Sequence, residues 1–253
     1  MLVVTAAGLC EPACSRGTGT APKTSATMRI GIGEPSKGMP NIGTEVLIDA
    51  LKGDTWVSLK PDGRVAERIA TGWAWDANGT VLRLKLRNDV YFHDGTRLTP
   101  ELAAEAFRGI NAGNEGSSLG SLESVEAEGN DTIALKLKER DSFLLPDLGG
   151  MTVSKRGTPD IGTGPYQIAR REALDGSLTA FPRYYRGRPA LAGIDIRTYP
   201  TQRNAWTALM RGEIDMLYEV SRDPAEFVQA ETTVKTYLFP RPYYISLVFN
   251  MRD

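Results

Sequence analysis

Two stretches of the chain alternate between apolar and basic side chains. In residues 82–87, Leu82, Leu84 and Leu86 share one face of an extended segment, and basic residues occupy the other face. Residues 133–138 largely repeat this pattern. Because side chains of a strand point alternately to its two faces, the period predicts strands with one buried face. Two such strands favour an antiparallel sheet with one face in water, so the basic residues are interpreted as solvated.

Two helices are predicted around the first of these strands. Thr99 precedes Pro100, and an apolar stripe at helical spacing follows as far as Ile110. Threonine is a favourable N-cap, and proline suits the first helical position because the N–H that it lacks has no helical partner there. Residues 44–51 also carry apolar residues at helical spacing, and Gly53 is the expected stop.

The later part of the chain follows a strand–helix–strand pattern. Residues 194–199 are a predicted strand, Thr201 caps a predicted helix that Gly212 ends, and residues 213–217 are a predicted strand. This order is typical of a βαβ crossover in an α/β protein. A boundary between two subdomains is expected near residues 154–162, where the earlier pattern gives way to this one.

The composition limits the classes of function. The chain has 253 residues, of which 41% are hydrophobic and 24% are charged, as in a globular protein with a substantial core. Its 30 basic and 31 acidic residues are finely mixed, and no Lys/Arg-rich block marks a nucleic-acid surface. With one histidine, His93, the sequence excludes a catalytic or metal site built on several histidines.

Residues 1–27 are expected to be a signal or lipoprotein leader with a linker. An apolar run over residues 2–9 precedes Cys10 and Cys14, and a small, polar stretch follows. An apolar run, a cysteine and a tether are typical of bacterial lipoproteins. Because a small residue precedes Cys14, this cysteine is the expected lipid anchor. The alternative is a disordered tail with two unused thiols.

Patterns that point to catalysis are scarce. Gly162 and Gly164 lack the further glycine or the Gly-Lys-Ser/Thr continuation of phosphate-binding loops. Glu213 and Asp215 share one face of a predicted strand and are not interpreted as an acid–base pair. His93 precedes an Asp-Gly turn dipeptide, so a turn histidine bonded to the backbone is preferred to a proton shuttle.

The chain ends within a predicted strand. Residues 244–250 alternate between apolar and polar side chains. A domain terminus usually leaves its core through polar residues, so the chain is expected to be incomplete. The aromatic residues near this end, Tyr237, Phe239, Tyr243 and Tyr244, are interpreted either as core or as the lining of a groove.

A series of short motifs, taken together, is specific enough to indicate a protein family. In chain order they are Leu59–Val65, Ala70–Trp73, Leu82–Arg87, Val90–Thr99, Gly162–Tyr166, Tyr184–Pro189, Leu209–Asp215 and Tyr244–Asn250. In this order they resemble the extracellular solute-binding proteins of family 5, the peptide-, dipeptide- and nickel-binding proteins of ABC importers. One departure is Phe181, where the family usually has asparagine. The family's motifs are mainly structural, and none of them is a catalytic site.

The resemblance implies the fold of a periplasmic binding protein, with two lobes that close on a ligand by a hinge. We therefore expect an α/β first lobe of type II, family 5, formed by residues 28–43 plus 163–253. An inserted α+β subdomain is expected at residues 44–162. Because family members are considerably longer, the second lobe is expected to be missing.

The resemblance also implies the function. The chain is expected to be the substrate-binding component of an ABC importer, which binds peptides or similar small solutes and delivers them to the permease. It is expected to be a monomer without enzymatic activity, cofactor, metal or nucleic-acid partner. Its expected place is the periplasm or the extracellular face of the cytoplasmic membrane, with a lipid anchor as one means of attachment.

The edge of the ligand cleft is expected in two segments. These segments contribute Glu34, Pro35 and Ser36 from the loop after the first strand, and Tyr243, Tyr244 and Asn250 from the strand near the hinge. Glu34 either meets a ligand amine or caps its own loop. The two tyrosines are expected to cover apolar side chains of the ligand.

Three other interpretations stay open at this point. A solute-sensing regulatory module of the same fold would carry a helix-turn-helix upstream, and residues 1–27 are too few for one. A secreted hydrolase is disfavoured because no nucleophile–base pattern is recognisable. The third is a truncated, non-functional fragment of a longer protein.

Overall fold

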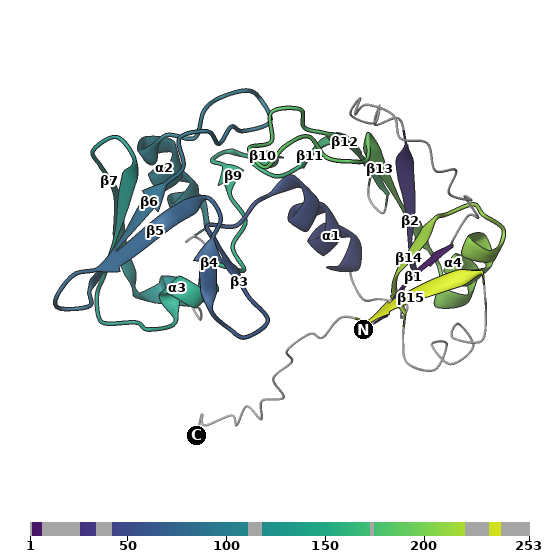
Figure 1. Cartoon of the computed structure of the whole chain (residues 1–253), viewed down its shortest axis with the longest axis horizontal. Coiled ribbons are helices and arrows are strands. Elements are labelled where there is room, and N and C mark those ends of the chain that lie inside the picture. The colour runs from purple at the N-terminus through teal and green to yellow at the C-terminus, as the bar shows by residue number, and fades with distance from the viewer. Residues whose placement is uncertain are drawn as a thin grey trace, which may run out of the picture. The chain divides into compact units, whose positions relative to one another are not determined.

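The computed structural model describes residues 2–6, 26–33, 42–110, 118–172, 175–220 and 233–238. The chain divides into two compact units (Figure 1). Unit 1 comprises residues 1–21, 28–40 and 196–253, and unit 2 comprises residues 22–27 and 41–195. The division expected from the sequence, 28–43 plus 163–253 and 44–162, stays a prediction, since compact units need not coincide with the lobes of a whole protein.

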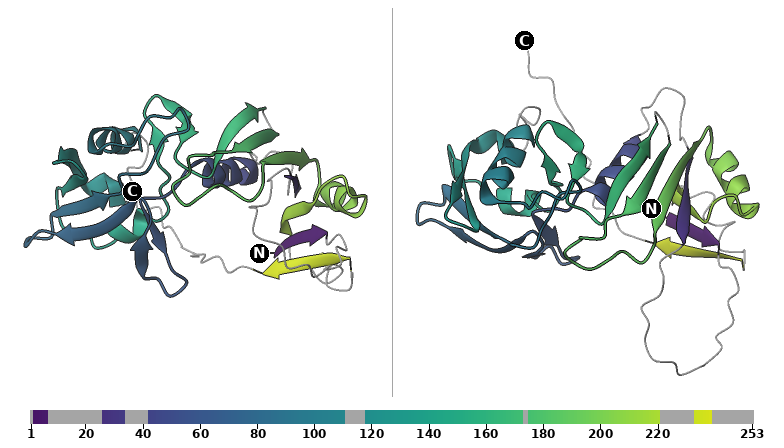
Figure 2. Two further views of the ribbon diagram at one scale, coloured as in Figure 1. Left: turned by 45° about the horizontal axis from the view of Figure 1, so that its top comes forward. Right: turned by 90° about the horizontal axis from the view of Figure 1, so that it is seen from above.

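Unit 1 contains a mixed sheet. β2 (Thr27–Gly33) pairs in parallel with β14 (Met216–Val220). β1 (Leu2–Ala6) pairs antiparallel with β14 and with β15 (Val234–Leu238). α4 (Gln202–Met210) contacts β14 (Figure 2). The sheet thus combines parallel and antiparallel pairs.

The strand–helix–strand prediction is confirmed. β13 (Gly193–Tyr199), α4 and β14 follow one another along the chain. The Thr201 hydroxyl caps α4 by accepting a hydrogen bond from the backbone N–H of Asn204 at 3.1 Å. β14, the second strand of this strand–helix–strand unit, begins at Met216 rather than at Glu213. The reason is that Arg211 and Gly212 form the turn that ends α4, where Gly212 has a φ of +70°.

β1 lies inside residues 1–27, the stretch that the sequence predicts as a leader. Its register pairs Leu2 with Leu238 and Thr5 with Met216, on its two sides. The structure thus places this apolar segment in a sheet, where its backbone groups have partners. The assignment of residues 1–27 as a leader stays a prediction.

An ion pair fixes the register of β2 against β14. The carboxylate of Asp215 accepts hydrogen bonds from the backbone N–H of Arg29 at 2.8 Å and from two nitrogens of its guanidinium at 2.7 and 3.0 Å. The backbone N–H of Asp215 donates in turn to the Arg29 carbonyl at 2.8 Å. Next to this clamp, a Cβ on Gly31 would lie 2.3 Å from Ile214 Cδ1, so a larger residue there would displace the end of the Ile214 side chain.

Unit 2 contains the antiparallel sheet that the alternating segments predict. β5 (Ala70–Trp75), β6 (Val81–Leu86), β8 (Thr132–Leu137) and β7 (Leu122–Glu128) are neighbours in that order. The register places Leu84 opposite Ile133, and both side chains are fully buried.

The solvated face of this sheet carries ion pairs between its strands. Arg83 pairs with Glu128 at 2.8 Å, and Lys136 pairs with Glu126 at 2.7 Å. Arg87 departs from the expectation of a solvated face. Its side chain is 31% exposed, bonded to Asp89 and placed 4.7 Å from the ring centroid of Tyr185.

The core of unit 2 lies between this sheet and α2 (Pro100–Ile110). The predicted helix start is confirmed, because the Thr99 hydroxyl accepts a hydrogen bond from the Leu102 backbone N–H at 3.4 Å. Phe107 of α2 stacks on Trp56, with ring centroids 4.2 Å apart, and both rings are fully buried. Burial of two large aromatic rings makes this stack a principal contributor to the hydrophobic stabilisation of the unit.

Unit 2 also contains elements outside this sheet and α2. They are α1 (Ile42–Lys52), β3 (Val57–Leu59), β4 (Val65–Glu67), η2 (Ser118–Ser121), α3 (Leu144–Asp147), β9 (Ser154–Lys155), β10 (Thr158–Gly162), β11 (Tyr166–Arg171) and β12 (Gly176–Ala180). Within the described ranges, no helix has the length and hydropathy that crossing a membrane requires.

Removal of the Asp215 carboxylate tests the clamp in unit 1. We expect Asp215→Ala to lower the free energy of unfolding by about 1–2 kcal/mol, the value for hydrogen bonds to a charged group after discount for solvent exposure. Urea unfolding at pH 7 measures this change. Glu213→Ala is the matched control, since Glu213 lies 3.9 Å from Arg211 on the surface and its loss should cost less than about 0.5 kcal/mol. Equal effects of the two variants would contradict the clamp.

Candidate functional site

The Phe92–Thr96 segment forms a tight turn in unit 2. The Phe92 N–H donates to the Thr96 carbonyl at 2.8 Å, and the Asp94 carboxylate accepts from the Thr96 N–H at 2.9 Å. Gly95 has a φ of +85°, a conformation that favours glycine. The Asp-Gly turn expected from the sequence is therefore present, and it presents His93 to the segment around Gly162.

Both ring nitrogens of His93 contact the backbone of that segment. Nδ1 accepts a hydrogen bond from the Gly162 N–H at 3.3 Å, and Nε2 lies 3.1 Å from the Gly164 carbonyl oxygen. Because one nitrogen accepts while the other faces an acceptor, the geometry assigns the neutral imidazole with its hydrogen on Nε2. The prediction of a turn histidine bonded to the backbone is confirmed. With both nitrogens engaged, His93 has no ring nitrogen left to shuttle protons.

The environment of His93 favours this neutral form. Burial lowers the pKa of His93, and the positive charge of Lys52 lowers it further. The hydrogen bond to the Gly164 carbonyl and the charge of Asp94 oppose this shift only in part. The Phe181 ring and the imidazole pack in a T-shaped arrangement, with centroids 5.0 Å apart.

The glycines of this segment pass directly over the end of α1. A Cβ on Gly162 would lie 2.1 Å from the Lys52 carbonyl oxygen, and a Cβ on Gly164 would lie 2.6 Å from the Lys52 carbonyl carbon. The Gly164 N–H donates to that same oxygen at 2.8 Å, which gives a helix-terminal carbonyl a partner. Both glycines are therefore required by close backbone contact, and neither belongs to a phosphate-binding loop.

A buried carboxylate lies two residues beyond α1. The Asp54 side chain has no exposed surface, and it accepts hydrogen bonds from the hydroxyls of Tyr184 at 2.9 Å and Tyr185 at 2.7 Å. Its other oxygen is bonded to the Arg68 guanidinium and to the Thr55 N–H. These donors satisfy a charge that would otherwise be costly to bury.

The tyrosines of this cluster remain protonated donors. Burial and the negative charge of Asp54 raise the pKa of Tyr184 to about 12 and raise that of Tyr185 further above its usual range. The sequence pointed to these tyrosines only as part of a family motif. It gave no sign of Asp54 as their acceptor, because the partners lie far apart along the chain.

The two acidic residues weighed as an acid–base pair have separate roles. Asp215 holds Arg29, and this hydrogen bond lowers the pKa of the Asp215 carboxyl. Glu213 is exposed and lies near Arg211. Within the described residues, no group of three or more His, Cys, Asp or Glu side chains is placed to hold a metal ion.

The expected ligand and anchor residues lie outside the residues that the structure describes. They are Cys10, Cys14, Glu34, Pro35, Ser36, Tyr243, Tyr244 and Asn250. Of the C-terminal aromatic residues, Tyr237 is described; it is 48% exposed, with the Lys235 amine 5.1 Å from its ring centroid. The described residues therefore show the framework that the motifs build, and the predicted cleft edge stays a prediction.

Comparison with known proteins identifies this framework. The family model of the bacterial extracellular solute-binding proteins, family 5 Middle, matches residues 64–253. The chain belongs to this family. The match includes both His93 and the segment that its ring nitrogens contact, so the resemblance drawn from the motifs is confirmed.

Individual relatives of this family 5 chain are distant. A putative ABC transporter peptide-binding protein of Brucella ovis is 30% identical over 159 residues, which cover 54% of the chain and 30% of the relative. Oligopeptide-binding protein AppA of Bacillus subtilis is 27% identical over 161 residues, with the same shares. The chain thus spans less than a third of the length of these relatives in the matched region.

Solved structures confirm the α/β fold class of the family. AppA of Bacillus subtilis, in complex with a nonapeptide, has a TM-score of 0.69 at 20% identity over 83% of the chain and 47% of AppA. NikA of Staphylococcus aureus, in complex with Ni(L-His)2, has a TM-score of 0.70 at 18% identity over 82% of the chain and 46% of NikA. At these identities the likeness shows the fold alone.

The acceptor role of His93 predicts a pH dependence of stability. Because the folded protein lowers the pKa of His93, the unfolded chain binds a proton first as the pH falls through about 6.5. We therefore expect full stability above that pH and a loss below it of at most about 1.4 kcal/mol per pH unit. Urea unfolding between pH 7.5 and 5.5 measures this slope.

His93→Gln provides the comparison for this experiment. The chain has one histidine, so the variant should lose the slope across this pH range. A slope that persists unchanged in His93→Gln would show that another group titrates, and the assigned role of His93 would be wrong.

Proposed function

We propose that this chain is part of the substrate-binding component of an ABC importer. The family match over residues 64–253 is the observation that carries the proposal. In this role the protein holds a solute outside the cytoplasmic membrane, in the periplasm or at the extracellular face, and passes it to permease subunits. The function is binding and delivery, with no bond broken and no cofactor needed.

The names of the relatives and the ligands in their solved structures support a class of ligand. The Brucella ovis relative is named as a putative peptide-binding protein, and AppA was solved with a nonapeptide. NikA of Staphylococcus aureus was solved with Ni(L-His)2, and AgaA of A. tumefacien R10 with agropinic acid. We propose peptides, or small polar solutes with similar amine and carboxylate groups, as the ligands of this protein.

The proposed contacts are Glu34, Pro35 and Ser36 on one segment and Tyr243, Tyr244 and Asn250 on the other. Glu34 offers a charge for a ligand amine, and charge-assisted hydrogen bonds of this kind are stronger than neutral ones. The tyrosines offer apolar area with a polar tip. The protein is proposed to act as a monomer whose lobes close on the ligand by a hinge.

The chain covers only part of the length of its solved relatives, and this suggests an alternative to the proposed function. Because it covers 46% or 47% of the solved relatives described above, a ligand would lack contacts that those longer chains provide. A truncated fragment without transport function is therefore the second candidate. A solute-sensing regulatory module of the same fold has less support, since the named relatives are transport proteins.

Peptide retention distinguishes these candidates. The 253-residue chain, and the longer protein encoded if the downstream DNA continues the reading frame, are each incubated with a tryptic digest of casein. Retained peptides are identified by mass spectrometry and titrated by calorimetry. We expect retention by the longer protein only. Glu34→Gln in that protein should weaken binding about tenfold, as for loss of a charge-assisted hydrogen bond.

Glu213→Gln is the matched control and should bind as the parent protein does. Micromolar binding by the 253-residue chain alone would contradict the incomplete cleft. A stop codon with no continuation, together with no retention, would favour the fragment. A longer protein that retains no peptide would exclude peptides as the ligand class.

The proposed lipid anchor is Cys14. Growth of an expressing bacterium with radioactive palmitate should label the native protein, and Cys14→Ser should abolish the label because it removes the acylated thiol. Cys10→Ser is the matched control and should keep the label. Equal labelling of native and Cys14→Ser protein would exclude Cys14 as the anchor.

A further inference from the structure

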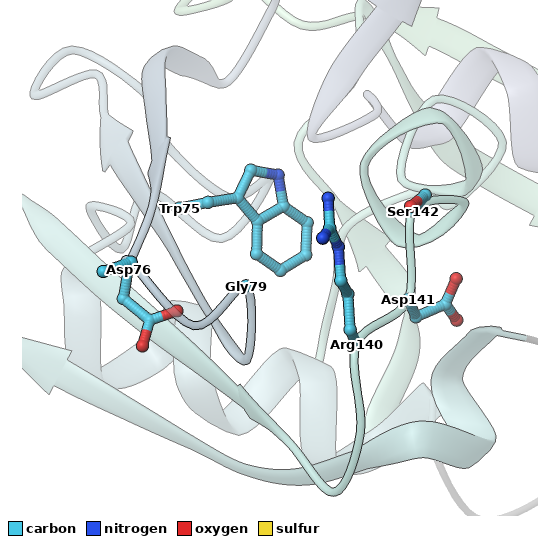
Figure 3. Close-up of a pocket in the computed structure, with 7 residues that line it drawn as sticks. Trp75, Asp76, Gly79, Arg140, Asp141 and Ser142 are labelled. Atoms are coloured by element: carbon cyan, nitrogen blue, oxygen red, sulfur yellow. The ribbon is translucent and has the colours of Figure 1, made fainter.

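The turn between β5 and β6 contains Asn78, the one asparagine of the chain that a glycine follows. Asn78 is exposed at this turn of the antiparallel pair. Gly79 has a φ of +72° and no Cβ beside its backbone nitrogen. Figure 3 shows Asp76 and Gly79 on the turn, with the long, flexible side chain of Arg140 against Gly79. The turn therefore joins an exposed side-chain amide to the least hindered backbone nitrogen that a chain offers.

An asparagine in this position can lose ammonia without an enzyme. The Gly79 backbone nitrogen attacks the side-chain carbonyl carbon of Asn78, so that a new N–C bond forms and the C–N bond of the side-chain amide breaks. The displaced nitrogen takes the proton of the Gly79 N–H and leaves as ammonia, and a cyclic succinimide remains. Water then opens the ring at either carbonyl, which gives aspartate or isoaspartate. Nothing is oxidised or reduced.

Two other turns of unit 2 place a glycine at positive φ after an acidic residue, and both hold the acidic side chain in place. They are Asp62–Gly63 and Asp94–Gly95. The first carboxylate accepts hydrogen bonds from the backbone N–H of Arg64 at 3.0 Å and from its guanidinium at 2.7 Å. The second accepts from the Thr96 N–H at 2.9 Å and from the Lys155 amine. Ionised carboxylates held in this way are poor targets for attack by a backbone nitrogen.

The Asn78 turn differs from these two in its side chain and in its backbone hydrogen bond. Within the described part of the chain, the Asn78 side-chain amide has no hydrogen-bond partner, so it is free to rotate toward the next nitrogen. The Gly79 N–H donates to the Asp76 carbonyl at 3.1 Å, whereas the corresponding bonds of the other two turns measure 2.9 Å. The Asp76 carboxylate also accepts from the N–H groups of Thr80 and Val81, each at 2.9 Å. Ring closure therefore requires this turn to open, and Asp76 is the residue that opposes the opening.

We propose that Asn78 is a site of spontaneous deamidation, with Gly79 as the residue that closes the ring. The hydrogen bonds of Asp76 set the rate in the folded protein, because the turn has to open before the Gly79 nitrogen reaches the side chain. Isoaspartate adds a backbone carbon between Asp76 and the N–H groups of Thr80 and Val81, which disturbs the bonds that close the turn. The site is separate from the residues proposed for the ligand cleft and does not depend on the proposed function.

Peptide mapping of the 253-residue chain tests the proposal. The folded protein is kept in mildly alkaline buffer made with heavy-oxygen water, sampled over several weeks and digested with trypsin in ordinary water. Trypsin releases residues 69–83 as one peptide, in which Asn78 is the only asparagine. We expect loss of ammonia from this peptide, followed by uptake of one heavy oxygen from the solvent. The chain unfolded in urea should react about tenfold faster, because no hydrogen bond then opposes ring closure.

Two aspartate variants test the role of the turn. Asp76→Ala should speed the reaction at Asn78 about threefold, because it removes the side-chain bonds that keep the turn closed. Asp62→Ala, which removes a similar carboxylate from another turn, is the matched control and should leave the rate at Asn78 unchanged. Asn130 is the internal control, since it is exposed in the turn between β7 and β8 but precedes an aspartate. It should stay unmodified while Asn78 reacts.

Three results would contradict these assignments. An unmodified 69–83 peptide from the folded protein, under conditions in which the unfolded chain reacts, would overturn the proposal. Equal rates at Asn78 and Asn130 would also overturn it, because the following glycine would then have no effect. A rate that Asp76→Ala leaves unchanged would exclude Asp76 as the residue that opposes the opening. Circular dichroism establishes that Asp76→Ala is folded; Asp76→Asn, which keeps an acceptor oxygen, is the second variant and should react at a rate between those of the parent and Asp76→Ala.

Discussion

The constraint on which unit 2 depends is the buried charge of Asp54. A carboxylate removed from water costs several kcal/mol unless donors surround it. Here the donors are Tyr184, Tyr185, Arg68 and the Thr55 backbone, which come from separate parts of the chain. An arrangement of these segments that left out any of these donors would leave the buried charge with fewer partners. The cluster therefore selects how the segments assemble, in addition to any stability that it adds.

His93 and the two glycines act at the same place in the fold. Gly162 and Gly164 lie against the last carbonyl groups of α1, and the imidazole bonds to the backbone of both. Asp54 lies two residues beyond α1, so the end of this helix is where the Asp54 and His93 contacts converge. The two motifs that contain His93 and these glycines are thus explained by backbone packing and buried hydrogen bonds.

Local patterns predicted much of the framework. Alternation around Leu84 and Ile133 predicted two paired strands, and Thr99 predicted the start of a helix, because both signals lie within a few residues. Asp54 was not predicted as an acceptor, since its partners are remote in sequence and leave no periodic signal. The proposed cleft residues rest on family resemblance, and they lie outside the described residues.

The engagement of His93 has a practical consequence. Because it is the one imidazole in the chain, its ring nitrogens give isolated resonances in a spectrum selectively labelled at histidine. Their chemical shifts depend on which nitrogen carries the hydrogen, so they report whether the two backbone contacts are intact. The protein therefore carries an intrinsic spectroscopic reporter of local order in unit 2, which can be observed without introducing a dye or a new side chain.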